Sequence, residues 1–145
     1  MDLERQDALA RLGHARVARM ATVGPNGRPH VVPFVFALDG TTIYWTVDRK
    51  PKRSEHLARL EHIRANPHVE LVADHYEEDW SMLWWVRAAG TARTLDQGPE
   101  RDRALDLLAT KYPQYRGQLP AGPVVAIDLS RWSGWSGRAP STPPV

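Results

Sequence analysis

The sequence contains no cysteine. This absence excludes disulfide bonds, thiolate metal sites and a cysteine nucleophile. No stretch approaches the roughly 18 to 20 apolar residues that a helix needs to span a bilayer. The first residues, Met1 to Arg5, lack the basic start and the apolar stretch of a signal peptide. We therefore expect a cytoplasmic protein that contacts no membrane.

The chain also lacks a strong excess of charge of one sign, because its formal net charge is only +2. A balance this close to neutrality gives no general argument for nucleic acid, and we expect none as a partner. The positive charge is concentrated between Arg49 and Arg64, where six Lys or Arg residues stand against two Glu. This stretch is either the solvated start of a helix or a site for an anionic ligand.

Motifs of several catalytic classes are absent. The chain has no Gly-x-Ser-x-Gly elbow, no phosphate loop of the Walker type and no Gly-x-Gly-x-x-Gly after a strand. It has six histidines, but none of them forms the i, i+4 pair of a helical zinc site, and we expect no metal. What remains is a cofactor that brings its own chemistry.

Turn residues divide much of the chain into strands. The turn signals at 24–27 and 39–40 separate predicted strands over 15–23, 30–38 and 41–47. Two successive hairpins predict an antiparallel meander, since parallel strands would need long crossovers. Further strands are predicted over 69–73, 80–95 and 124–129, with a short extension at 132–135. Gly90 is placed to form a bulge or bend in the longest of these strands.

Three other segments have helical periodicity. They cover residues 2–12, about 52–65, and a stretch that opens with Pro99 in its first turn and closes before Pro113. Six or seven strands with about three helices predict a mainly β (α+β) fold, a small antiparallel barrel with added helices. We expect a single domain over 1–138 and a disordered tail over 139–145.

The strand from His30 to Phe36 and the basic run behind the third strand together suit a hydride-carrying cofactor. Such a cofactor needs a flat apolar slot, backbone hydrogen bonds to its ring edge and cations for an anionic tail. The strand offers the slot and the backbone, although its apolar residues would form core in any β-protein. The third strand ends at Thr46 and Val47, directly before the basic residues Arg49, Lys50, Lys52 and Arg53.

Tryptophan is abundant, with six residues, and Trp80, Trp84 and Trp85 are close in sequence. The side chains of Trp84 and Trp85 must point to opposite faces of a strand. One of them can fill the core. The other needs a partner subunit or a ligand ring.

Several of these segments resemble one known family. The segments 16–23 and 27–36 resemble the pyridoxamine 5'-phosphate oxidase-like superfamily of FMN-binding split barrels. The segments 63–71 and 79–90 resemble its coenzyme F-420 (deazaflavin)-dependent oxidoreductase branch, which is typical of actinobacteria. The resemblance runs from about residue 8 to 136. Arginine far outnumbers lysine, as in GC-rich actinobacterial genomes, which favours F-420 over FMN.

The resemblance implies a split-barrel homodimer with two cofactor sites at the subunit interface. The ring of the cofactor would lie along the strand, and its phosphate would meet basic residues that follow the third strand, with Lys52, Arg53 and Arg59 as alternatives. The candidate cofactor-binding residues are His30, Val31, Val32, Pro33, Phe34, Thr46, Val47, Lys50, Lys52, Arg53, Arg59 and Trp80.

The expected activity is hydride transfer between F-420 and a small unsaturated or quinone-like molecule. No residue in the sequence stands out as an acid or base for this reaction. One alternative is an FMN-dependent oxidase or reductase of the same superfamily. Another is a non-catalytic protein that binds a cofactor or haem.

Overall fold

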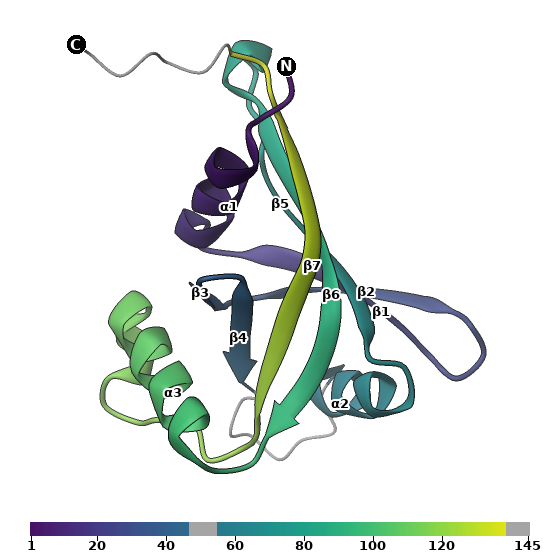
Figure 1. The fold of residues 1–145 in the computed structure, drawn as a ribbon, viewed down its shortest axis with the longest axis vertical. Helices are drawn as coiled ribbons and strands as arrows, with labels where there is room; N and C mark the ends of the chain where they lie inside the picture. Colours follow the sequence, from purple (N-terminus) through teal and green to yellow (C-terminus); the bar gives the residue numbers. More distant parts are fainter. Residues whose placement is uncertain (47–54, 139–145) are drawn as a thin grey trace.

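The computed structural model describes residues 1–46 and 55–138. Within these residues seven strands form one antiparallel sheet, in the order β2-β1-β5-β6-β7-β4-β3, and three α-helices pack around it (Figure 1). This architecture confirms the predicted mainly β split barrel with six to seven strands and about three helices. The tail over 139–145, which we expect to be disordered, lies outside the described residues.

The elements follow the predicted order along the chain. The strands are β1 (Ala18–Val23), β2 (Pro29–Phe34), β3 (Ala37–Asp39), β4 (Thr42–Thr46), β5 (His68–His75), β6 (Trp84–Leu95) and β7 (Val124–Ser136). The helices are α1 (Arg5–His14), α2 (Glu55–Ala65) and α3 (Pro99–Lys111), with short 3₁₀ turns η1 (Trp80–Met82) and η2 (Pro113–Tyr115). No helix in these described ranges has the length and apolar character to cross a membrane.

The strand predicted over 30–38 is in fact two strands. Its first half, β2, pairs with β1, and its second half, β3, pairs with β4. The two halves occupy opposite edges of the sheet, so the predicted three-stranded meander is wrong at its second strand. The break has a physical cause. The backbone N–H of Phe36, between the halves, donates to the hydroxyl of Tyr112 instead of to a neighbouring strand.

The longest predicted strand begins later than expected. Residues 80–82 form the turn η1, because the carboxylate of Asp79 accepts a hydrogen bond from the backbone N–H of Ser81 at 3.0 Å and caps the turn. At the other end of the chain, β7 is one continuous strand and not a strand with a separate extension. The bulge predicted at Gly90 is confirmed, since the pairing of β6 with β7 shifts register between Ala89 and Gly90.

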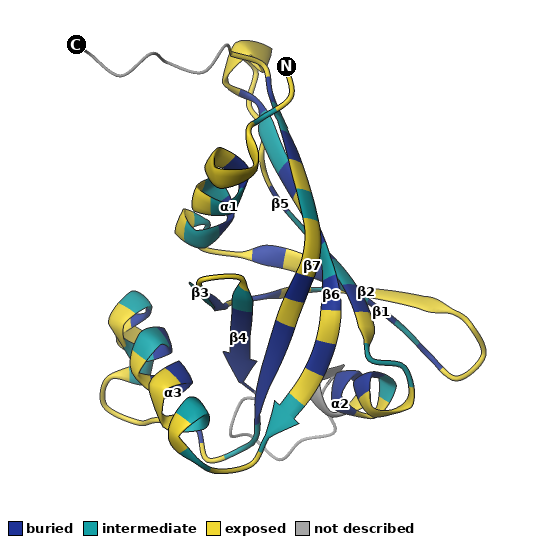
Figure 2. Ribbon diagram, viewed as in Figure 1, coloured by how far each residue is buried: buried dark blue, intermediate teal, exposed yellow. Residues whose placement is uncertain are grey.

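The main core lies inside the coiled sheet and is closed by α1 and α2. Leu12, Phe36, Trp45 and Ile127 are among its fully buried residues. Figure 2 shows that β4 is buried over most of its length while β2 is mostly exposed. β2 therefore combines an edge position in the sheet with a surface that is open to a ligand or a partner.

Candidate functional site

A large, mainly apolar cavity lies beside the exposed strand β2. Its volume is about 530 Å³, which falls within the usual size of small-molecule sites. The walls come from β2, the end of β4, α2 and η2, and none of the described residues that line the cavity is a carboxylate. The lining residues are Val17, Pro33, Phe34, Val35, Trp45, Thr46, Arg59, Tyr112, Gln114 and Tyr115.

A second, smaller cavity of about 140 Å³ continues along the same strand. It is lined by His30, Val31, Val32, Ala58, Arg59 and His62. Arg59 lines both cavities, so the two hollows follow β2 on either side of its guanidinium. The structure thus brings together seven of the predicted site residues: His30, Val31, Val32, Pro33, Phe34, Thr46 and Arg59.

Arg59 is an unusual residue for its position, because only 3% of it is exposed. Its guanidinium lies 5.0 Å from the ring centre of Trp45, within the range of a cation–π contact. Arginine is almost never buried without a structural or binding reason. A permanent positive charge therefore sits in the wall between two hollows that are otherwise mainly apolar.

The remaining predicted site residues do not join this group. Val47, Lys50, Lys52 and Arg53 lie outside the described residues. Trp80 belongs to η1, at the end of the molecule where the N-terminus and the end of β7 also lie, and not at the end where β4 ends (Figure 1). It is 74% exposed and does not line either cavity of its own chain.

The two neighbouring tryptophans of β6 are both half-buried. Trp84 packs against the main core and carries the guanidinium of Arg11 at 5.6 Å from its ring centre. Trp85 has the guanidinium of Arg87 at 5.9 Å. The prediction that one tryptophan serves the core is confirmed for Trp84, while a partner for Trp85 stays a prediction.

Tyr112 fixes the wall of the large cavity at the point where the chain passes from β2 to β3. Its hydroxyl accepts a hydrogen bond from the N–H of Phe36 at 3.2 Å and donates to the carbonyl oxygen of Arg16 at 2.9 Å. Burial raises the pKa of this hydroxyl. No local sequence signal marks this role, because its partners are distant in the chain.

Lys111 supports the same connection between β2 and β3. Its Nζ donates to the carbonyl oxygens of Ala15 at 2.6 Å and Gly13 at 3.2 Å, and lies 4.1 Å from the ring centre of Phe36. Burial, together with the nearby positive charge of Arg16, lowers the pKa of Lys111 to about 8. Its hydrogen bonds engage backbone carbonyls, so it acts here as a structural group.

Replacing Tyr112 by phenylalanine tests this clamp. We expect a loss of about 1 to 3 kcal/mol in the free energy of unfolding, because the buried N–H of Phe36 would lose its partner. Urea denaturation followed by fluorescence measures the loss. Tyr76→Phe removes an exposed hydroxyl and serves as the control. Equal stability of the two variants would contradict the clamp.

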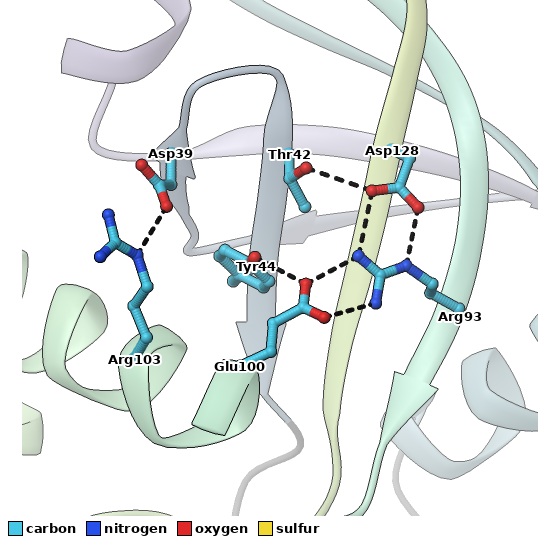
Figure 3. Close-up of polar contacts among 7 residues, drawn as sticks. All are labelled: Asp39, Thr42, Tyr44, Arg93, Glu100, Arg103 and Asp128. Atoms are coloured by element: carbon cyan, nitrogen blue, oxygen red, sulfur yellow. Dashed lines mark hydrogen bonds and ion pairs between the residues drawn. The ribbon is translucent and has the colours of Figure 1, made fainter. Parts of the chain in front are cut away.

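A charged network anchors α3, whose far end leads to the cavity wall (Figure 3). Arg93 of β6 makes two hydrogen bonds of 2.7 Å to Glu100 of α3 and a third, also 2.7 Å, to Asp128 of β7. Tyr44 of β4 donates to Glu100 at 2.8 Å. Three strands and the start of α3 are thereby joined by one guanidinium, and Thr42 adds a hydrogen bond to Asp128.

The network shifts the pKa values of the side chains that form it. Hydrogen bonding to Arg93 holds the pKa values of Glu100 and Asp128 below their usual range. Burial, and then the hydrogen bond to Glu100, raises the pKa of Tyr44 to about 12. A carboxylate with a lowered pKa contributes stability above its unfolded-state pKa, and that contribution is lost as the pH falls through the folded-state value.

Glu100→Gln should therefore destabilise the protein at pH 7, by a small amount because the partners are more than one-third exposed. The difference from the wild type should shrink as the pH falls below the ordinary glutamate pKa of about 4.3, because the unfolded chain then takes up a proton that the hydrogen bonds to Arg93 oppose in the folded state. Urea midpoints at pH 7 and pH 3 measure this. Glu78→Gln, at an exposed position in the loop before η1, is the control. A constant difference at both pH values would contradict the role of this carboxylate.

Comparison with known proteins supports the fold. The family profile described as pyridoxamine 5'-phosphate oxidase matches residues 5–136. No curated protein matches the sequence. Among solved structures, the conserved hypothetical protein Rv2991 from Mycobacterium tuberculosis is 17% identical, with a TM-score of 0.77 over 99% of this chain and 92% of that one.

Two further solved structures share the fold and differ in what their names say they bind. The FAD binding protein from Mycobacterium smegmatis is 17% identical, with a TM-score of 0.65 over 93% of this chain and 98% of that one. The heme storage protein HutZ from Vibrio cholerae is 13% identical, with a TM-score of 0.67 over 90% of each chain.

Proposed function

We propose, because the chain belongs to the pyridoxamine 5'-phosphate oxidase family, that it is an oxidoreductase that binds a flavin-type cofactor along β2. The finer proposal is that this cofactor is the deazaflavin coenzyme F-420 and that the acceptor is a small unsaturated or quinone-like molecule. The observation that carries the proposal is the cavity of about 530 Å³ along an edge strand, with the buried cation Arg59 in its wall.

The residues of the cavity suit a cofactor with a flat ring and an anionic tail. Phe34 and Trp45 give apolar surface, while Thr46 and Arg59 supply a hydroxyl and a guanidinium. A guanidinium binds phosphate with paired hydrogen bonds, and burial strengthens that attraction. β2 is an edge strand, and its backbone groups are therefore available to the edge of a ring, except at Pro33, which has no N–H.

When bound, the reduced cofactor supplies the hydride, so the chain need only bind, orient and exclude water. The apolar walls around Phe34 would exclude water from a bound ring. Arg59, which lines both cavities, would bind an anionic group of the cofactor. Tyr112 and the network at Arg93 keep the wall of the large cavity in place.

The choice of F-420 over FMN rests on the segments 63–71 and 79–90, which resemble the F-420-dependent branch. FMN and FAD remain the alternatives within the same site. The name of the M. smegmatis relative supports a flavin in this fold, and the name of HutZ supports haem.

Titration with F-420, FMN, FAD and haemin tests the proposal. Trp45 lines the cavity, so its fluorescence should be quenched when a ring enters, and Trp45→Phe should lose that component. We expect F-420 to bind with a Kd below about 100 μM, which corresponds to about 5 to 6 kcal/mol. Binding of FMN or FAD alone would reject F-420 as the cofactor. Binding of haemin alone would favour a haem-binding protein. Binding of none of the four would reject the proposal.

The same proposal includes a homodimer whose cofactor sites lie between subunits. An exposed, well-held tryptophan supports it. Trp80 is 74% exposed on a capped turn, and a Cβ at Gly137 would lie only 2.3 Å from its carbonyl oxygen, so the backbone just after β7 packs against this turn. Large exposed aromatic residues on rigid turns are typical of interfaces. Since Trp80 is far from its own cavity, we propose that it covers the cavity of the second subunit.

A mixed dimer distinguishes this arrangement from its alternatives. One chain would carry Trp80→Ala and the other Arg59→Met, each with a different affinity tag. If Trp80 acts across the interface, the mixed dimer has one intact site and binds cofactor at half the wild-type amount with wild-type affinity. If Trp80 acts within its own chain, both sites are damaged. A monomer in light scattering would reject the interface site.

A further inference from the structure

Two imidazole rings meet at the small cavity. His30 comes from β2 and His62 from α2, and their ring centres lie 4.4 Å apart with planes tilted by 47°. A Cβ built on Gly24 would lie 3.1 Å from Nε2 of His30 and 3.4 Å from Nε2 of His62. Both nitrogen atoms therefore face the same space, and the glycine at position 24 leaves that space open.

Thr22 orients one of the two rings. Its Oγ1 lies 3.3 Å from Nδ1 of His62, and Thr22 is only 1% exposed. When Nδ1 carries the proton and donates it to this hydroxyl, Nε2 of His62 is left with its lone pair. That lone pair then lies next to the space that Nε2 of His30 also borders. The two rings can share an added proton across this space, directly or through one water molecule.

The proposed reaction needs a proton as well as a hydride. Among the lining residues within 1–46 and 58–138, His30 and His62 are the ones with an imidazole, the side chain that ordinarily exchanges protons near neutral pH. Burial raises the pKa of Tyr112, and Arg59, which also lines the small cavity, stays protonated. The same described lining residues include no carboxylate and no lysine.

We propose that His30 is the proton donor of the reaction and that His62, oriented by Thr22, positions and recharges it. This inference rests on the proposed function. When bound, a reduced deazaflavin or flavin would supply a hydride, with two electrons, to one end of a C=C bond conjugated to a carbonyl. His30, as imidazolium, would give a proton to the electron pair of the broken π bond and be left as neutral imidazole. The acceptor would leave reduced and the cofactor oxidised, and His30 would take up a new proton from water through His62.

The first test needs no cofactor. In protein with ¹⁵N-labelled histidine, NMR should report His62 as the tautomer protonated at Nδ1. Thr22→Val should remove that preference, because it keeps the shape of the side chain and deletes the acceptor. His68→Gln, at an exposed histidine on β5, should leave the His62 signal unchanged. A wild-type His62 protonated at Nε2 would overturn the role given to it.

The second test measures the proton step. Cofactor binding is titrated first, and then oxidation of the reduced cofactor is followed with cyclohex-2-enone and with menadione as probes. With the reduced cofactor held at a saturating concentration for each protein, we expect His30→Ala to reduce the enone at least about a hundredfold more slowly than the wild type. Added imidazole should restore part of that rate, which a structural defect would not allow.

Two more variants separate donor from positioning residue. His62→Gln should lower the rate of enone reduction about tenfold. Added imidazole should not restore all of this loss, because His62 positions His30 as well as recharging it. Gly24→Ala keeps both imidazoles and should slow the reaction, because its methyl group would occupy the space that both Nε2 atoms face. Gly24 has no positive φ, so alanine fits its backbone.

The outcomes distinguish the two proposals. A wild-type protein that binds none of the cofactors rejects the proposed function. A protein that binds the reduced cofactor yet transfers hydride to neither probe rejects the oxidoreductase part of that function. A protein that reduces a probe equally fast with and without His30 rejects the proton donor alone.

Discussion

Replacing Arg59 by methionine is expected to weaken cofactor binding by about thirtyfold or more. Methionine keeps an unbranched apolar stem that can pack on Trp45 but removes the charge. A buried guanidinium that binds an anionic group contributes about 2 to 5 kcal/mol, which corresponds to a factor of about 30 or more in Kd. Tryptophan quenching during titration with F-420 measures the change.

Arg64 provides the matched control for this variant. It lies on the same helix, in its last turn, and is exposed. Arg64→Met should bind cofactor as the wild type does. Urea denaturation of both variants shows whether the loss at Arg59 reflects folding. Wild-type affinity in Arg59→Met would move the anionic end of the ligand to the basic run, where the charge reversals Lys52→Glu and Arg53→Glu together should then weaken binding more than tenfold.

Gly90→Ala should destabilise the fold by about 3 kcal/mol. A Cβ at this position would lie 2.4 Å from the carbonyl oxygen of Asp128 and 3.0 Å from Cγ2 of Ile127. The first contact is with backbone in the paired strand β7, which cannot move aside without breaking the ladder at the bulge. Overpacking of this kind costs about 1 to 3 kcal/mol and occasionally more.

Gly117→Ala is the control, because nothing lies within 4 Å of a Cβ at Gly117 and its φ is not positive. Its free energy of unfolding should change by no more than about 0.5 kcal/mol. Both variants are measured by urea denaturation with tryptophan fluorescence. If Gly90→Ala unfolds at the same urea concentration as the control, the close packing at the bulge is not needed for stability.

Much of the fold could be predicted because the decisive signals are local. The turn at 24–27, Asp39–Gly40 and Pro99 each act through their own backbone, and each begins or ends an element as predicted. Gly90 likewise marks its bulge. These residues owe their effect to φ angles, missing side chains or a missing N–H, which the sequence states directly.

The errors arise where a distant side chain decides the local structure. The strand over 30–38 is apolar throughout, so nothing in it predicts the change of partner at Phe36, which Tyr112 imposes from beyond α3. The sequence predicts too early a start for β6, because tryptophan favours strands, while the cap by Asp79 acts through hydrogen bonds to the single residue Ser81.

The candidate site divides in the same way. His30, Pro33, Thr46 and Arg59 could be named because the strand and the basic stretch around it have the right composition. Residues from later in the chain could not. Gln114 and Tyr115 reach the cavity from η2, and His62 gains its significance only from His30 and Thr22, which the fold brings to it.

The connection from β2 to β3 joins the two edge strands of the sheet. Edge strands are where local unfolding begins and where strands of other molecules can add. Because both edge strands belong to one short stretch of chain, separation of either one from its neighbour pulls on the other through Phe36. A ligand held along β2 would therefore slow amide hydrogen exchange in β3 as well, although it does not touch that strand. The binding free energy of the ligand would then stabilise both edge strands against local unfolding.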